Sequence, residues 1–269
     1  MRAAWFGRVL FAVGCALLGA LTLSWHDFYR EWLPLAKELG GYGALTTVFG
    51  IFLVAGGIGL LISRTVRPAA FALALVMLVL LLAKLPVVAT HPLVEGVWED
   101  FSESLVYLAG AWTLFWLPPR ASHTPSVSIM AGVGQILFAV ALPALGLSHL
   151  VYLNLTTPLI PSWLPFHVGL AYFTGAAHIA AGVGILFGLM PRLAAVLEAL
   201  MVTLFTLLVW VPLVAPFTAN RFEWSEFCVS TIISGSAWII AASLRERPWL
   251  DLPGPRKVQD LLRWHTNRS

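Results

Sequence analysis

Charged residues are scarce in this sequence, and cysteine is scarcer still. Only 11% of the 269 residues are charged and 59% are hydrophobic, whereas soluble domains have about 25% charged and about 45–50% apolar residues. This composition excludes an ordinary water-soluble domain. The two cysteines, Cys15 and Cys228, form neither a CxxC motif nor a metal-ligand pattern. We expect both to be small apolar packing residues.

The sequence contains several long runs of apolar residues. About 20 apolar residues cross the ~30 Å hydrocarbon layer as a helix, and only helices or closed barrels satisfy every backbone hydrogen bond there. The runs are apolar on all faces, whereas barrel strands alternate apolar and polar residues. The sequence therefore predicts an all-α polytopic membrane protein with eight transmembrane helices, at about residues 4–24, 42–63, 68–89, 102–117, 128–152, 166–189, 193–215 and 228–244.

The basic residues predict the orientation of these spans. Twelve arginine and lysine side chains fall on one side of the predicted membrane, and three, Arg30, Lys37 and Arg221, fall on the other. The positive-inside rule then puts both termini in the cytoplasm. The net charge of +3 comes from clusters beside apolar runs, so we expect a lipid bilayer and no nucleic acid as partner.

An internal repeat divides the chain. Gly7–Val13 (GRVLFAV) returns as Gly134–Val140 (GQILFAV), and Lys84–Ala89 (KLPVVA) returns as Trp210–Ala215 (WVPLVA). Each copy has an even number of spans, so the sequence predicts two parallel four-helix repeats. The predicted divisions are a first unit at 1–117, a cytoplasmic linker at 118–127, a second unit at 128–244 and a cytoplasmic tail at 245–269, in which Val258, Leu261, Leu262 and Trp264 suit either a short interfacial helix or a solvated tail.

Four motifs of the second copy carry a family resemblance. Gly146–His149 (GLSH), Pro161–Pro165 (PSWLP), Tyr172–Gly182 (YFTGAAHIAAG) and Arg192–Ala195 (RLAA) resemble the DoxX-like membrane proteins. With a weaker match in the first copy, the resemblance covers about residues 5–245.

The resemblance implies a four-helix unit in a bacterial inner membrane. Such a unit occurs in the small subunit of a thiosulfate:quinone oxidoreductase, so the resemblance also implies a possible quinone ligand and a redox or periplasmic partner protein. Family members often carry an acidic residue in the second helix. This chain has Leu53 and His178 there, which weakens any transfer of activity.

Three polar residues share one face of the predicted helix 166–189. His167, Thr174 and His178 are spaced so that they line up along it. His178 is predicted either to exchange a proton or donate to a carbonyl-bearing ligand such as a quinone, or to be satisfied structurally by a Ser, Thr or backbone carbonyl. His149, at the outer end of helix 128–152, is expected to approach His167. Two histidines alone predict no metal site, because zinc takes three or four ligands.

Lys84 is the one lysine expected inside a span. It lies about five residues from the outer end of helix 68–89, roughly 8 Å deep, within reach of the interface. Glu103 or Glu99 is its expected partner, in a structural ion pair or in a proton or anion site facing the periplasm. Glu198 is expected to pair with Arg192 or a serine.

Three functions fit these residues. The first is a membrane subunit of a redox system that binds a quinone-like or other small hydrophobic ligand. The second is a carrier of a small solute, with or without coupling to protons, and the third is a non-catalytic scaffold for a partner protein. The sequence contains no catalytic motif, so it leaves open whether the protein is an enzyme and which cofactor, if any, it uses.

Overall fold

Every regular element in the described part of the chain is a helix. The computed structural model describes residues 2–28, 41–117 and 125–252. Outside them lie residues 118–124 of the predicted linker, the basic residues Arg30 and Lys37, and the predicted interfacial helix of the tail. The elements are α1 (Arg2–Trp25), α2 (Tyr42–Leu61), α3 (Val66–Thr90), α4 (Glu95–Trp116), α5 (Pro125–Val151), α6 (Leu153–Thr156), the 3₁₀ turn η1 (Thr157–Leu159), α7 (His167–Leu186), α8 (Pro191–Phe205), the π-helical turn η2 (Thr206–Trp210), α9 (Val211–Val214) and α10 (Arg221–Ser243).

Seven of the described helices are long and apolar enough to cross a membrane. They are α1, α2, α3, α5, α7, α10 and the continuous run of α8, η2 and α9. Helix α4 is 22 residues long but is not among them, because its first half carries Glu95, Glu99, Asp100 and Glu103. The structure therefore confirms, for the residues it describes, an all-helical fold that is compatible with a multi-pass membrane protein.

Two helices begin well before the apolar runs predicted. Helix α4 starts at Glu95 and α10 starts at Arg221, each seven residues before its predicted span. In α10 a capping box explains the early start: the side chain of Asn220 accepts from the backbone N–H of Glu223, and the side chain of Glu223 accepts from the N–H of Asn220. Hydropathy does not detect a polar first turn of this kind.

The predicted span 193–215 is not a uniform α-helix. A π-helical turn, Thr206–Trp210, interrupts it, and α9 continues to Val214. Pro212 explains the interruption, because proline lacks the N–H group that the preceding turn needs.

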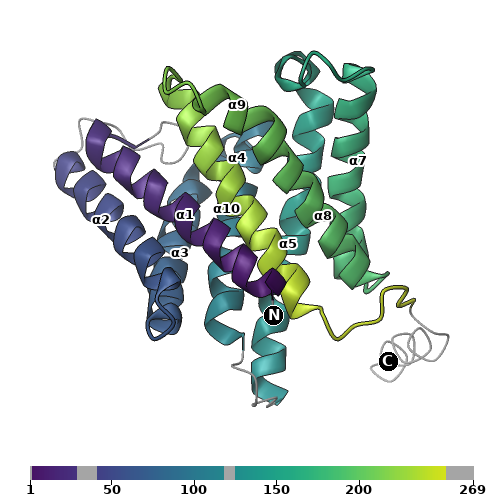
Figure 1. Ribbon diagram of the computed structural model, residues 1–269, viewed down its shortest axis with the longest axis horizontal. Helices are drawn as coiled ribbons and strands as arrows, with labels where there is room; N and C mark the ends of the chain where they lie inside the picture. Colours follow the sequence, from purple (N-terminus) through teal and green to yellow (C-terminus); the bar gives the residue numbers. More distant parts are fainter. Residues whose placement is uncertain (1, 29–40, 118–124, 253–269) are drawn as a thin grey trace.

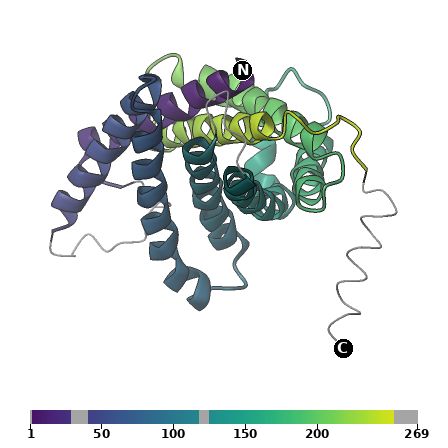
Figure 2. The same cartoon turned by 90° about the horizontal axis from the view of Figure 1, so that it is seen from below.

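Each long helix packs against the next one in the chain. Neighbours follow the order α1, α2, α3, α4, α5, α7, α8 and α10, and α10 then packs against α1, so the order closes into a ring (Figure 1). Helix α10 also contacts α4 across this ring. The view turned by 90° shows α1 and α10 side by side above α4 (Figure 2).

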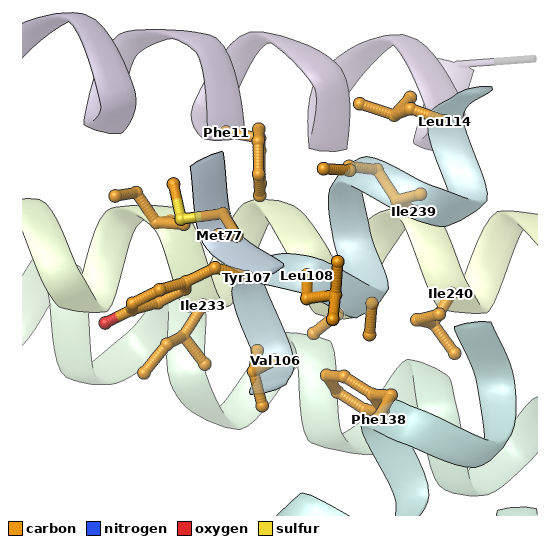
Figure 3. Packing of buried hydrophobic residues seen from close by; sticks show 14 of the residues in the cluster. Phe11, Met77, Val106, Tyr107, Leu108, Leu114, Phe138, Ile233, Ile239 and Ile240 are labelled. Atoms are coloured by element: carbon orange, nitrogen blue, oxygen red, sulfur yellow. The ribbon is translucent and has the colours of Figure 1, made fainter. Parts of the chain in front are cut away.

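The core gathers where α4 and α10 meet. Phe11, Met77, Tyr107, Phe138 and Ile239 are completely buried and come from five helices (Figure 3). Both cysteines are buried and free, as expected. Large apolar side chains also lie on the outside, among them Val79 and Phe173, each 65% exposed. An apolar exterior around a packed interior suits a lipid environment.

Candidate functional site

A tight turn places two ionisable side chains at the same level of an antiparallel helix pair. Helix α7 ends at Leu186, Gly188 adopts a positive φ of 71°, and α8 begins at Pro191. Glycine takes this conformation without strain, and proline suits the first turn of a helix. His178 lies eight residues before the end of α7, and Glu198 lies seven residues after the start of α8.

His178 and Glu198 form a buried pair. The Nδ1 atom of His178 lies 2.8 Å from Oε1 of Glu198, and the two residues are only 4% and 1% exposed. The second carboxylate oxygen, Oε2, is buried and has no hydrogen-bond partner among the described residues. An unsatisfied carboxylate oxygen inside a bundle is energetically costly.

The expected partners of these two residues were wrong. Glu198 pairs with a histidine, whereas Arg192 stacks on Trp249, with its Cζ atom 4.0 Å from the ring centroid, and donates to the carbonyl oxygen of Arg247. For His178, the structural partner expected from the sequence was a Ser, a Thr or a backbone carbonyl. The partner in the structure is a carboxylate instead. The sequence could have predicted this pair. When a short turn joins two antiparallel helices, residues at equal distances before and after the turn lie side by side.

A second histidine extends the pair toward α5. Nδ1 of His149 lies 2.8 Å from Oγ1 of Thr174, and the His149 ring meets the His178 ring edge-on, with centroids 5.3 Å apart. Phe205 of α8 contacts both rings, at centroid distances of 5.8 and 6.0 Å. We call His149, Thr174, His178, Glu198 and Phe205 the histidine–glutamate site.

This site lies inside a four-helix group. Helix α5 packs on α7, α7 on α8, α8 on α10 and α10 on α5, so α5 and α8 face each other diagonally, and their side chains His149 and Phe205 meet between them. His178 and Glu198 are buried, whereas His149, Thr174 and Phe205 are partly exposed. The site therefore has a buried end with the ionisable pair and a more accessible end.

The charge balance of the pair suits proton exchange. A lone carboxylate inside a bilayer is expensive, and one proton shared between an imidazole and a carboxylate makes the pair neutral overall. Loss of that proton leaves one net negative charge. A ligand that stabilises or destabilises this negative charge therefore changes how readily the pair gives up its proton.

Of the four predicted site residues, the structure brings together three. His149, Thr174 and His178 meet as described, and the structure adds Glu198 and Phe205 to them. His167 opens α7 about two turns before Thr174, and within the described ranges it makes no hydrogen bond or ring contact with the other site residues. His149 thus approaches His178 instead of His167.

Lys84 lies in a separate acidic surrounding. Its Nζ atom lies 2.5 Å from Oδ1 of Asp100 and 3.0 Å from the backbone oxygen of Asp100. Glu99 and Glu103, the partners named from the sequence, flank Asp100 on α4, and Glu226 of α10 lies within electrostatic range of Glu103. The structure thus adds Asp100 and Glu226 to the predicted group.

Among the described residues, no group of three or more His, Cys, Asp and Glu side chains is arranged to hold a metal ion. Comparisons of the chain with protein-family models, with curated proteins and with solved structures found no match.

Proposed function

We propose that the chain is a bacterial inner-membrane protein with eight spans, built as two parallel four-helix units that resemble the DoxX-like proteins. The order of helix neighbours supports the duplication. Helices α1, α2, α3 and α4 follow one another as α5, α7, α8 and α10 do, and α4 packs on α5 as α10 packs on α1. The positive-inside pattern supports cytoplasmic termini.

Helix α4 is the eighth span in this proposal. Its apolar part begins near residue 102, and its carboxylates then lie at the outer membrane surface, with Lys84 reaching toward them. Ionisable residues at a span's end are tolerated because they reach the interface.

Within this architecture, we propose that the protein is a membrane subunit of a redox system and that its histidine–glutamate site binds a quinone-like ligand and exchanges a proton with it. The observation that carries the proposal is the buried His178–Glu198 pair, whose Oε2 atom has no partner among the described residues. A second imidazole and an aromatic ring stand beside it. Such a group can hold an aromatic ring and move a proton.

Comparison with the first unit indicates that the His178–Glu198 pair is not needed for packing. The shift that relates the contact of Gly59 with Ala69 to the contact of Gly184 with Ala194 also relates Leu53 to His178 and Leu73 to Glu198. Both leucines are completely buried. Under the proposed repeat, the same positions therefore pack well with two apolar side chains, and the charged pair is explained by a function.

The matching double variant tests the proposal. His178→Leu with Glu198→Leu copies the first unit, and replacing a buried ion pair with apolar groups commonly preserves stability. We expect the purified wild type to carry a quinone detectable by mass spectrometry, the double variant to fold and lose it, and Thr46→Val, a buried change in α2, to keep it. Absence of quinone from the wild type, together with no binding of added decylubiquinone or decylubiquinol, contradicts the proposal.

A proton-coupled carrier is the second candidate, and prolines at corresponding places in the two units favour it. Pro86 lies inside α3, which stays α-helical through it, and a π-helical turn precedes Pro212 at the corresponding place in the second unit. Proline-containing spans in corresponding positions of two repeats are typical of transporters that rock one repeat against another. In vesicles with a pH-sensitive dye, a carrier shows solute-dependent proton movement that the double leucine variant abolishes, whereas a quinone-binding subunit shows none.

A further inference from the structure

The unpartnered atoms of the histidine–glutamate site indicate which chemical groups a ligand must bring. Three polar atoms have no hydrogen-bond partner in the described part of the chain: Nε2 of His149, Nε2 of His178 and Oε2 of Glu198. Each becomes a donor or an acceptor according to where the protons lie, so their roles follow from their neighbours' bonds.

Thr174 determines the role of His149. The Thr174 hydroxyl has one proton, and we assign it to the carbonyl oxygen of Ala171, which lies 3.1 Å away, since hydroxyl protons and imidazole tautomers are assigned from the surrounding hydrogen bonds. A carbonyl can only accept, so the hydroxyl oxygen of Thr174 accepts from Nδ1–H of His149 at 2.8 Å. In the neutral imidazole the other nitrogen, Nε2, is then an acceptor.

The His178–Glu198 pair contributes both kinds of group. If the shared proton lies between Nδ1 of His178 and Oε1 of Glu198, Nε2–H of His178 is a free donor and Oε2 of Glu198 is a free acceptor. If the proton lies on Oε2, the two roles are reversed. Either arrangement leaves one donor and one acceptor. The whole site then presents two acceptors and one donor, and it presents three acceptors once the shared proton leaves.

From this excess of acceptors we infer that the site binds its ligand through hydroxyl groups, and therefore takes a quinol or a related phenol in preference to the quinone. This inference rests on the proposed function. A quinone carbonyl only accepts and satisfies only the single donor of the site. A quinol hydroxyl donates as well as accepts, so it can satisfy the acceptor atoms that the protein leaves open.

The surroundings of the three atoms fit an aromatic alcohol that arrives from the bilayer. Phe205 offers a ring contact to a flat ligand beside the two imidazoles. His149, Thr174 and Phe205 are partly exposed, whereas Glu198 is 1% exposed. A ligand hydroxyl thus meets the accessible histidine before the buried carboxylate.

A matched pair of ligands tests the inference. Decylubiquinol and decylubiquinone share one ring and one tail, and both are titrated into the full-length protein in detergent at pH 7 without oxygen. We expect the quinol to bind about tenfold more tightly, the effect of one additional satisfied acceptor. Glu198→Gln replaces a carboxylate oxygen with an amide donor, so we expect the preference to fall below about threefold. Thr46→Val, in the other unit, keeps the wild-type preference.

Each outcome is decisive. Equal affinities, or tighter binding of the quinone, overturn the preference for hydroxyl groups and leave the proposed quinone-like site standing. Binding of neither ligand overturns the proposed site and the inference together. If Glu198→Gln keeps its helical circular dichroism and its elution volume but retains the tenfold preference, Glu198 is not the acceptor, and the inference fails at that atom.

Discussion

The ammonium group of Lys84 lies 2.5 Å from the carboxylate of Asp100, and this pair ties the C-terminal part of α3 to the first half of α4. The lysine side chain is 3% exposed and that of Asp100 is 26% exposed. Glu99, Asp100 and Glu226, together with Lys84 itself, lie within electrostatic range of Glu103. Lys84 thus supplies the positive charge for a surrounding in which carboxylates of α4 and α10 repel each other.

Removing that positive charge is expected to destabilise the protein. Lys84→Met leaves Asp100 without its cation while keeping most of the side-chain volume, and we expect a loss of about 1–3 kcal/mol in the free energy of unfolding. Thermal unfolding in detergent, followed by circular dichroism, measures it. Adding Asp100→Asn should restore part of the loss, and a double-mutant cycle gives the coupling. Simple additivity of the two changes contradicts a direct ion pair.

Glu95 is expected to make stability depend on pH. It opens α4, before the apolar part of that helix, and its two carboxylate oxygens are buried without a hydrogen-bond partner in the described chain. Burial, and then repulsion by Glu99, raise the pKa of Glu95 from its ordinary value of 4.5 to about 7. The folded state therefore holds this proton more tightly than the unfolded state. Its contribution to stability is complete below about pH 4.5 and is lost as the pH rises through about 7.

The variant Glu95→Gln separates this contribution from other titrations. Its amide cannot ionise, so we expect its melting temperature to exceed that of the wild type at pH 8 and to match it near pH 4.5. The quantity measured is the difference between the two proteins across this range. A constant difference contradicts a raised pKa at Glu95.

Much of the fold was predictable because bilayer physics acts on composition. Apolar runs located the long helices to within a few residues at most ends, since a spanning helix must be apolar along its length. The starts of α4 and α10 were missed because their first turns are polar. The π-helical turn at Thr206 was missed because hydropathy does not indicate which backbone N–H bonds to which carbonyl.

The candidate site was only partly predictable, because its contacts join different helices. The helical spacing placed Thr174 and His178 on one face. His149 and His178 were candidates because polar side chains inside a membrane are energetically costly. The partner of His178 was missed because Glu198 was assigned to the nearest basic residue along the chain. Register across the turn at Gly188, rather than distance in sequence, brings the two together.

The segment after α10 folds back onto the start of α8, and one aromatic contact is expected to hold it. The backbone N–H of Met190 donates to the carbonyl oxygen of Asp251 at 2.7 Å, and Trp249 stacks on Arg192. Trp249→Ala should speed hydrogen exchange of the Met190 amide about two- to fivefold, as an exposed cation–π contact of about 0.5–1 kcal/mol implies. Trp163→Ala, at an exposed tryptophan elsewhere, is the control. Unchanged exchange at Met190 shows that the stacking does not hold the segment.

The distance between α5 and α7 is expected to control the histidine–glutamate site. A Cβ atom on Gly175 would lie 2.7 Å from the carbonyl oxygen of Gly146, so Gly175→Ala must push the two helices apart. Overpacking of this kind costs about 1–3 kcal/mol. Because His149 belongs to α5 and Thr174 to α7, the same shift lengthens their hydrogen bond and should weaken decylubiquinol binding.

Gly132→Ala is the matched control, since it makes the same substitution in α5 where no atom lies within 4 Å of the added Cβ. We expect this variant to be as stable as the wild type, or slightly more stable because alanine favours helix, and to bind decylubiquinol unchanged. Unfolding and ligand titration are measured on both variants in the same detergent. If Gly175→Ala loses stability but keeps its affinity, the site tolerates the displacement of α5, and the His149–Thr174 contact does not set the binding geometry.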